Sequence, residues 1–152
     1  MSVRSASILG ISLGMPAADA AARARRAGAR FAGFLGSHVT YTSRQGTLYV
    51  HLDEEGLVVS VAGPRLELNN RPVAKSGSPR SELRAVLGDP DHRSPVEFER
   101  LLEEMEKNSP DLTSDLDGLA EGREFWWYWG RTLSVLVDRR GAHSFHLQPP
   151  EG

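Results

Sequence analysis

Residues 47–62 read TLYVHLDEEGLVVSVA, and residues 132–147 read TLSVLVDRRGAHSFHL. Five positions are identical at one constant offset: Thr47, Leu48, Val50, Asp53 and Gly56 correspond to Thr132, Leu133, Val135, Asp138 and Gly141. Each stretch predicts a strand, an Asp-x-x-Gly turn and a second strand, because strand-forming residues flank a turn-forming pair. The sequence therefore predicts one β-hairpin that occurs twice.

A helix is predicted upstream of each hairpin, over residues 17–32 and 80–87. The two helices follow Gly-Met-Pro at residues 14–16 and Gly-Ser-Pro at residues 77–79. Proline suits the first helical position, because its φ is already helical and its missing N–H would have no partner there. The unit that repeats is thus a helix followed by hairpins.

The second copy contains an insertion near residues 95–118, with a predicted helix over residues 95–107. Apolar residues recur there at helical spacing: Phe98, Leu101, Leu102 and Met105. Residues 89–124 hold twelve Asp/Glu and four Lys/Arg, so the insertion is acidic. Glu103 and Glu104 either steer a basic partner toward the protein or simply form the solvated face of the helix.

These patterns predict an α+β fold of two helix-plus-antiparallel-hairpin repeats, with the helices packed on a sheet. We expect residues 1–63 to form the first repeat and residues 64–152 the second, which carries the helical insertion. The two repeats are expected to make one compact unit.

The composition excludes several classes of function. The net charge is −2, which does not favour a nucleic-acid partner. The chain has no cysteine, so disulfides, thiolate metal sites and a cysteine nucleophile are excluded, in agreement with a reducing cytoplasm. No stretch reaches the roughly 18 apolar residues of a membrane span. The run over residues 8–15 is a poor signal sequence, because it contains two glycines and a serine. We expect a cytoplasmic protein.

The second hairpin predicts which aromatic side chains share a face. If Gly130-Arg131 is a two-residue turn, Tyr128 pairs with Leu133 and Trp126 with Val135. These four side chains are then expected on the face that packs against the core. The residues that alternate with these are expected on the opposite face: Trp127, Trp129, Ser134 and Leu136.

The first hairpin gives a matching prediction. A three-residue loop over residues 44–46 pairs Tyr41 with Tyr49, which places both with His51 on the face away from the helices. Both copies would then expose aromatic residues on one face, as binding surfaces often do. The alternatives are that a β-bulge swaps the faces and buries Trp127 and Trp129 in the core, or that the helix of the insertion covers them.

Catalysis is a minor alternative. Residues 10–14 match the G-x-S-x-G pattern of a serine nucleophile, but only eleven residues precede Ser12, too few for the strands that come first in such hydrolases. His143 and His146 are three apart in a strand and point to opposite faces, so they predict no metal site. We expect neither an enzyme nor a cofactor.

Short motifs resemble known families. Leu-Gly-Met-Pro at residues 13–16, before a helix, and the pattern x-V-x-L-D-x-x-G-x-V at residues 49–58 resemble the SmpA/OmlA outer-membrane lipoprotein unit. They are also similar to the tandem units of the β-lactamase inhibitor protein family. Residues 68–72 and 86–90 look like uncharacterised bacterial domains found near toxin genes.

The resemblance implies a repeated helix-on-sheet layer whose aromatic-rich concave face binds a protein. The chain departs from these families because it has no cysteine for a lipid anchor or for disulfides. That departure favours a cytoplasmic relative, such as an immunity protein that neutralises a bacterial toxin.

The expected function is therefore that of a non-catalytic protein-binding module, an immunity or inhibitor protein. Its expected contact residues are Trp127, Trp129, Tyr41, Tyr49, His51, Leu136, Glu103 and Glu104. The alternatives are an envelope-assembly scaffold and a small hydrolase that uses Ser12. The sequence predicts no oligomeric state.

Overall fold

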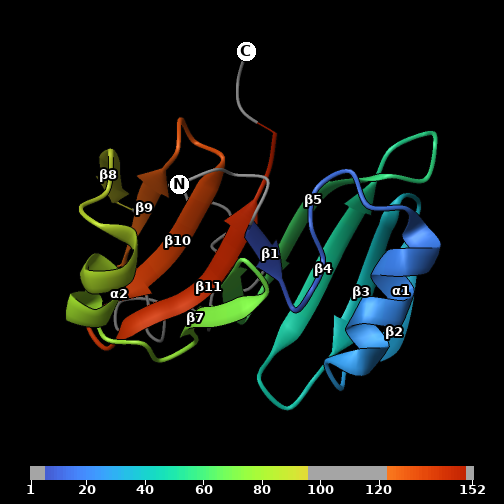
Figure 1. Ribbon diagram of the computed structural model, residues 1–152, viewed down its shortest axis with the longest axis horizontal. Coiled ribbons are helices and arrows are strands. Elements are labelled where there is room, and N and C mark those ends of the chain that lie inside the picture. Colours follow the sequence, from blue (N-terminus) through green and yellow to red (C-terminus); the bar gives the residue numbers. More distant parts are fainter. Residues whose placement is uncertain (1–5, 96–122, 150–152) are drawn as a thin grey trace, which may run out of the picture.

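The computed structural model describes residues 6–95 and 123–149. This part of the chain is 51% strand and 16% helix, with two antiparallel sheets (Figure 1). The predicted α+β layout of two helix-on-sheet repeats is therefore wrong. The sequence patterns found the two helices and the central hairpins but missed the strands over residues 30–35 and 92–95.

The larger sheet has eight strands in the order β2-β3-β4-β5-β11-β10-β9-β8. Their bounds are β2 (Arg30–Leu35), β3 (His38–Thr42), β4 (Thr47–Leu52), β5 (Val58–Gly63), β8 (His92–Pro95), β9 (Glu124–Tyr128), β10 (Leu133–Asp138) and β11 (Gly141–Leu147). Two four-stranded meanders thus meet where β5 pairs with β11. Three residue pairs form this seam, between residues 61–63 and 145–147.

The smaller sheet has the order β1-β6-β7, with β1 (Ala6–Ile8), β6 (Arg65–Leu68) and β7 (Arg71–Lys75). It lies on the same side of the large sheet as α1 (Ala17–Arg26) and α2 (Arg80–Leu87), as Figure 1 shows. We call this side of the large sheet the inner face and the opposite side the outer face.

Both helices predicted upstream of the hairpins are present, and one differs in its end. The prediction for residues 80–87 is confirmed by α2. The helix predicted over residues 17–32 begins at Ala17 as expected, but its predicted end is wrong, because α1 ends at Arg26. Gly28 takes a left-handed φ of 84° and the Ala29 N–H bonds to the Ala24 carbonyl, an arrangement that ends the helix. The residues that follow form strand β2 instead.

The core lies between the inner face and the elements that cover it. One cross-sheet row consists of the partners Val50, Val61, Leu147, Leu133 and Tyr128. Buried residues of the covering elements pack on this face: Ile8, Leu66, Ala20, Ala24 and Leu83. Each fully buried leucine, isoleucine or valine side chain among these contributes about 1.5–3 kcal/mol to folding.

The register of the second hairpin is confirmed. Tyr128 is opposite Leu133 and Trp126 is opposite Val135. Gly130 and Arg131 have φ values of 62° and 70°, the pair of positive angles that a tight type I′ hairpin turn requires.

The register of the first hairpin differs from the prediction by one residue. Tyr41 is opposite Leu48, because Ser43 belongs to the loop and accepts hydrogen bonds from the Gln45 and Gly46 N–H groups through its hydroxyl. A shift of one residue moves a side chain to the other face of a sheet. Tyr41 therefore lies on the inner face.

Candidate functional site

The outer face of the large sheet is the candidate site. One row of directly opposite residues crosses it from strand to strand: Thr40, Tyr49, Ala62, His146, Ser134, Trp127 and His92. Within residues 6–95 and 123–149, the helices and the small sheet all lie on the inner side, so none of these elements covers the row (Figure 1).

Four of the predicted contact residues lie on this face. Trp127 and Tyr49 belong to the row just described. His51 follows Tyr49 by two residues on β4, and Leu136 follows Ser134 by two residues on β10, so both also point to the outer face. Tyr49 is 56% exposed, which is unusual for a large apolar side chain in a sheet. The structure thus brings together residues from both predicted hairpins.

Tyr41 and Trp129 do not lie on the predicted face. Tyr41 lies on the inner face against Phe31, with the rings edge to face and their centroids 6.1 Å apart. Burial raises the pKa of the Tyr41 hydroxyl, and the nearby Arg25 charge opposes this shift. Trp129 follows the end of β9 with a φ of 55° and packs against the core, because strand alternation stops where the turn begins. Glu103 and Glu104 lie outside the described residues.

Trp127 is held in place before any partner arrives. Its indole N–H donates a hydrogen bond of 3.0 Å to the Ser94 hydroxyl on β8. The Arg131 guanidinium carbon lies 5.9 Å from the Trp127 ring centroid. The ring centroid of Phe125, two residues earlier on β9, also lies 5.9 Å from that of Trp127. A fixed aromatic side chain loses little conformational entropy when a partner binds.

A hollow of about 560 Å³ opens beside Tyr49 and Leu136. It forms where β5 leaves the sheet after Gly63 while β4 and β11 continue, and glycine and proline residues line it: Gly46, Gly63, Pro64 and Gly77. Polar residues at its rim are Asp138, Arg140 and His143. A pocket of this size next to exposed aromatic side chains can accept one large side chain of a partner.

Four of the chain's five histidines are spread across this face, from β3 to the edge strand β8. His38, His51, His92 and His146 occupy outward strand positions, and His143 lines the hollow. Burial lowers the pKa of His146 below its ordinary value. The spacing of histidines along the chain gave no sign of this grouping, because it depends on which strands pair.

Strand β2 was missed by the sequence analysis and carries exposed apolar side chains on both faces. Phe31 and Phe34 lie on the inner side, opposite Tyr41 and Val39, and Leu35 lies on the outer side, opposite His38. Phe31, Phe34 and Leu35 are 61%, 73% and 84% exposed, and β2 is an edge strand of the large sheet. Exposed apolar edge strands are templates for pairing with another chain. The signal available in the sequence was Gly28, whose position before an aromatic-rich stretch argued against a continuing helix.

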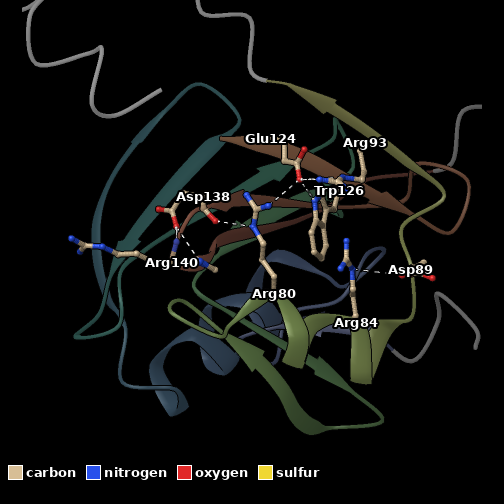
Figure 2. Close-up of polar contacts among 9 residues, drawn as sticks. Arg80, Arg84, Asp89, Arg93, Glu124, Trp126, Asp138 and Arg140 are labelled. Carbon is tan, nitrogen blue, oxygen red and sulfur yellow. Dashed lines mark hydrogen bonds and ion pairs between the residues drawn. The ribbon is translucent and has the colours of Figure 1, made fainter. Parts of the chain in front are cut away.

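A charged cluster on the inner face surrounds the buried Trp126 (Figure 2). The guanidinium carbons of three arginines lie over its ring, Arg84 at 5.1 Å, Arg93 at 5.6 Å and Arg80 at 5.8 Å from the centroid. Glu124 Oε1 accepts a 2.7 Å hydrogen bond from the Trp126 indole N–H and also pairs with Arg93 and Arg80.

These contacts connect α2, β8 and β9. Burial alone would raise the pKa of the Glu124 carboxyl, but the hydrogen bonds from Trp126 and Arg93 and the two arginine charges outweigh it and lower the pKa. Because the carboxylate and the arginines satisfy one another over a buried ring, we interpret this cluster as structural.

The loop that carries Ser12 is held by Glu67, a buried residue of β6. Glu67 Oε1 accepts a 3.1 Å hydrogen bond from the Ser7 hydroxyl and a 2.6 Å bond from the Gly10 N–H. Gly10 has a φ of 83°, which glycine adopts without strain. The turn after β1 therefore explains why the first glycine of the G-x-S-x-G pattern, Gly10, is a glycine.

No helix in the described residues is long and apolar enough to cross a membrane. No family model, curated protein or solved structure matches the chain. The function therefore has to be argued from the outer face itself.

Proposed function

We propose that the protein binds a protein partner through the outer face of the eight-stranded sheet. The observation that carries this proposal is the exposure of Tyr49 in the same cross-sheet row as Trp127, on a face that no described helix or strand layer covers. Tyrosine and tryptophan at the centre of a surface are the residues that most often supply binding energy.

The arrangement of this face fits a protein better than a small ligand. Strands β5, β11 and β10 lie between Tyr49 on β4 and Trp127 on β9, so one contact that includes both must span much of the sheet. The hollow beside Tyr49 offers a place for an inserted side chain, and the fixed Trp127 ring offers a flat apolar contact. Specific protein interfaces combine such anchors with a polar rim.

The edge strand β2 supports the same proposal. A partner that docks on the outer face next to β2 can also add a strand to the sheet there, because main-chain pairing and side-chain contacts act together in strand addition. Leu35 lies on the outer side of β2, opposite His38, and is 84% exposed. Leu35 thus adds an exposed apolar side chain at the edge of the outer face.

A narrower form of the proposal is that the partner is a bacterial toxin which the protein neutralises in the cytoplasm. Its support is the set of short motifs at residues 13–16, 49–58 and 68–72, and a toxin reading frame next to this gene is the observation that would strengthen it. The envelope-scaffold and Ser12 hydrolase alternatives stay hypotheses. Unchanged function in Ser12→Ala would end the second.

The experiment compares three purified proteins as baits in the native host's extract. They are the wild type, the double variant Tyr49→Ala with Trp127→Ala, and the control Arg71→Ala, which changes an exposed residue of the small sheet. We expect the wild type and the control to capture the same protein and the double variant to lose it.

The captured protein is then purified and its affinity for each variant is measured by calorimetry. Loss of two anchors should weaken binding by at least about a hundredfold, since each hot-spot truncation costs about 2 kcal/mol or more. Equal affinity of the wild type and a folded double variant would refute the proposal. Circular dichroism on the double variant shows whether it is folded.

A further inference from the structure

His38 on β3 and His51 on β4 are directly opposite each other on the outer face. Their imidazole rings are stacked, with centroids 4.1 Å apart and planes inclined by 8°. His38 is exposed and His51 is half-buried. The pair exists because the loop before β4 has four residues, which sets the register that brings residues 38 and 51 together.

From this geometry we infer that His38 and His51 form a binding site for a transition-metal ion of the class that imidazole nitrogen binds, such as Cu²⁺ or Zn²⁺. A metal–imidazole bond is about 2.0–2.1 Å long, so two of them span up to about 4 Å between nitrogens. Residues directly opposite on antiparallel strands have Cβ atoms only about 4.5–5.5 Å apart, which is within the reach of two imidazole side chains that share one ion. The rings stack face to face with their centroids 4.1 Å apart, so an ion would bind after both rings turn to direct one nitrogen each toward it.

The surroundings of the pair suit a cation. The neighbours in the same cross-sheet row are Leu35 and Ser60, so no lysine or arginine of that row lies beside the rings. The two strands fix the backbone of both ligands, which reduces the entropy lost when the rings are ordered on an ion. Imidazole ligands favour Cu²⁺ over Zn²⁺ by the usual order of divalent-metal affinity.

Two protein ligands leave the remaining positions of a four-coordinate ion open to water or to a ligand from another molecule. The site lies on the same face as Tyr49, because His51 follows Tyr49 by two residues on β4. The inference itself rests on the histidine geometry and does not depend on the proposed function.

The test is calorimetric titration of the whole protein with Cu²⁺ and with Zn²⁺ at pH 7.5, on the wild type, His38→Ala, His51→Ala and His92→Ala. His92 is the matched control, because it is an exposed histidine on the same face at the far edge of the sheet. We expect one site in the wild type and in His92→Ala, with Cu²⁺ bound more tightly. Either of the other variants should bind at least about tenfold more weakly, because it loses the second ligand and its high effective concentration.

Electron paramagnetic resonance of the Cu²⁺ complex gives an independent readout. Splitting from two nitrogens is expected in the wild type and from one nitrogen in His51→Ala. Zn²⁺ should raise the thermal midpoint of the wild type and not that of His51→Ala, because an ion that binds the folded state stabilises it. Affinity unchanged in both His38→Ala and His51→Ala, or reduced equally in His92→Ala, would overturn the inference.

Discussion

Trp126 and Trp127 follow each other in the chain and lie on opposite faces of the eight-stranded sheet. Trp126 has no exposed surface and lies under α2, where three arginines surround its ring. Trp127 lies on the outer face opposite Ser134. Because successive side chains of a strand point to opposite faces, neighbouring tryptophans can serve stability and binding separately.

The first prediction concerns Trp126. Trp126→Ala removes a large buried side chain and leaves three arginines over a cavity, so we expect the free energy of unfolding to fall by about 3–5 kcal/mol. Urea unfolding followed by circular dichroism measures this change. Trp127→Ala serves as the comparison and should lose less, because its ring is partly exposed. An equal loss in the two variants would contradict the assignment of the two faces.

The second prediction concerns Glu124. Glu124→Gln removes the charge that pairs with Arg93 and Arg80, and we expect a loss of about 1–3 kcal/mol in unfolding free energy at pH 7. The pKa of Glu124 is lower in the folded state than its ordinary value of 4.5. Its contribution to stability is therefore present above pH 4.5 and is lost as the pH falls through the folded-state pKa.

Unfolding measured between pH 7 and pH 3 should consequently show a smaller acid-dependent loss in Glu124→Gln than in the wild type. Glu82→Gln is the control, since Glu82 is an exposed residue of α2 for which we expect little change. If Glu124→Gln keeps the full acid dependence of the wild type, the carboxylate does not hold the arginine cluster together.

The third prediction concerns His146, whose pKa is lowered by burial below its ordinary value of 6.5. The unfolded chain binds a proton at this position at higher pH than the folded protein does. Stability is therefore unaffected by His146 above pH 6.5 and decreases as the pH falls below 6.5 toward the folded-state pKa.

Urea midpoints measured from pH 8 to pH 5 test this sign. The fall in stability below pH 6.5 should be smaller in His146→Gln than in the wild type. The same substitution at His143, an exposed residue of the same strand, should preserve the wild-type slope. A steeper slope in His146→Gln would show that the proton is bound more tightly in the folded state.

Local patterns in the sequence predicted the parts of the fold that depend on neighbouring residues. The turn at Gly130-Arg131 fixed the register of β9 and β10, and proline at residue 79 marked the start of α2. The same reasoning failed at residues 30–32, where a helix-forming Ala/Arg pattern runs into a strand. The pairing of β2 with β3 outweighs that local preference, since helix propensity is worth only tenths of a kcal/mol per residue.

The site could be predicted only in part for a related reason. Trp127 followed from one hairpin, but Tyr41 was placed on the wrong face because a single loop residue, Ser43, decides the register of the other. The stacked histidines depend on the same one-residue register, and the hollow requires knowledge of which distant strands are adjacent. The cluster at Trp126 joins residues of α2, β8 and β9, and no spacing along the chain encodes such a network.

The narrow seam between β5 and β11 has a consequence for the order of folding. Short turns join β2 to β3, β3 to β4, β4 to β5, β9 to β10 and β10 to β11, whereas the seam pairs residues about 80 positions apart, so its loop-closure entropy is far larger. We expect the meanders to form early and the seam to close late. Until it closes, β5 and β11 are both open strand edges, and at high protein concentration a nascent chain can join its β5 to the β11 of another molecule. The three pairs that complete the binding face would then also be the point where two chains exchange halves.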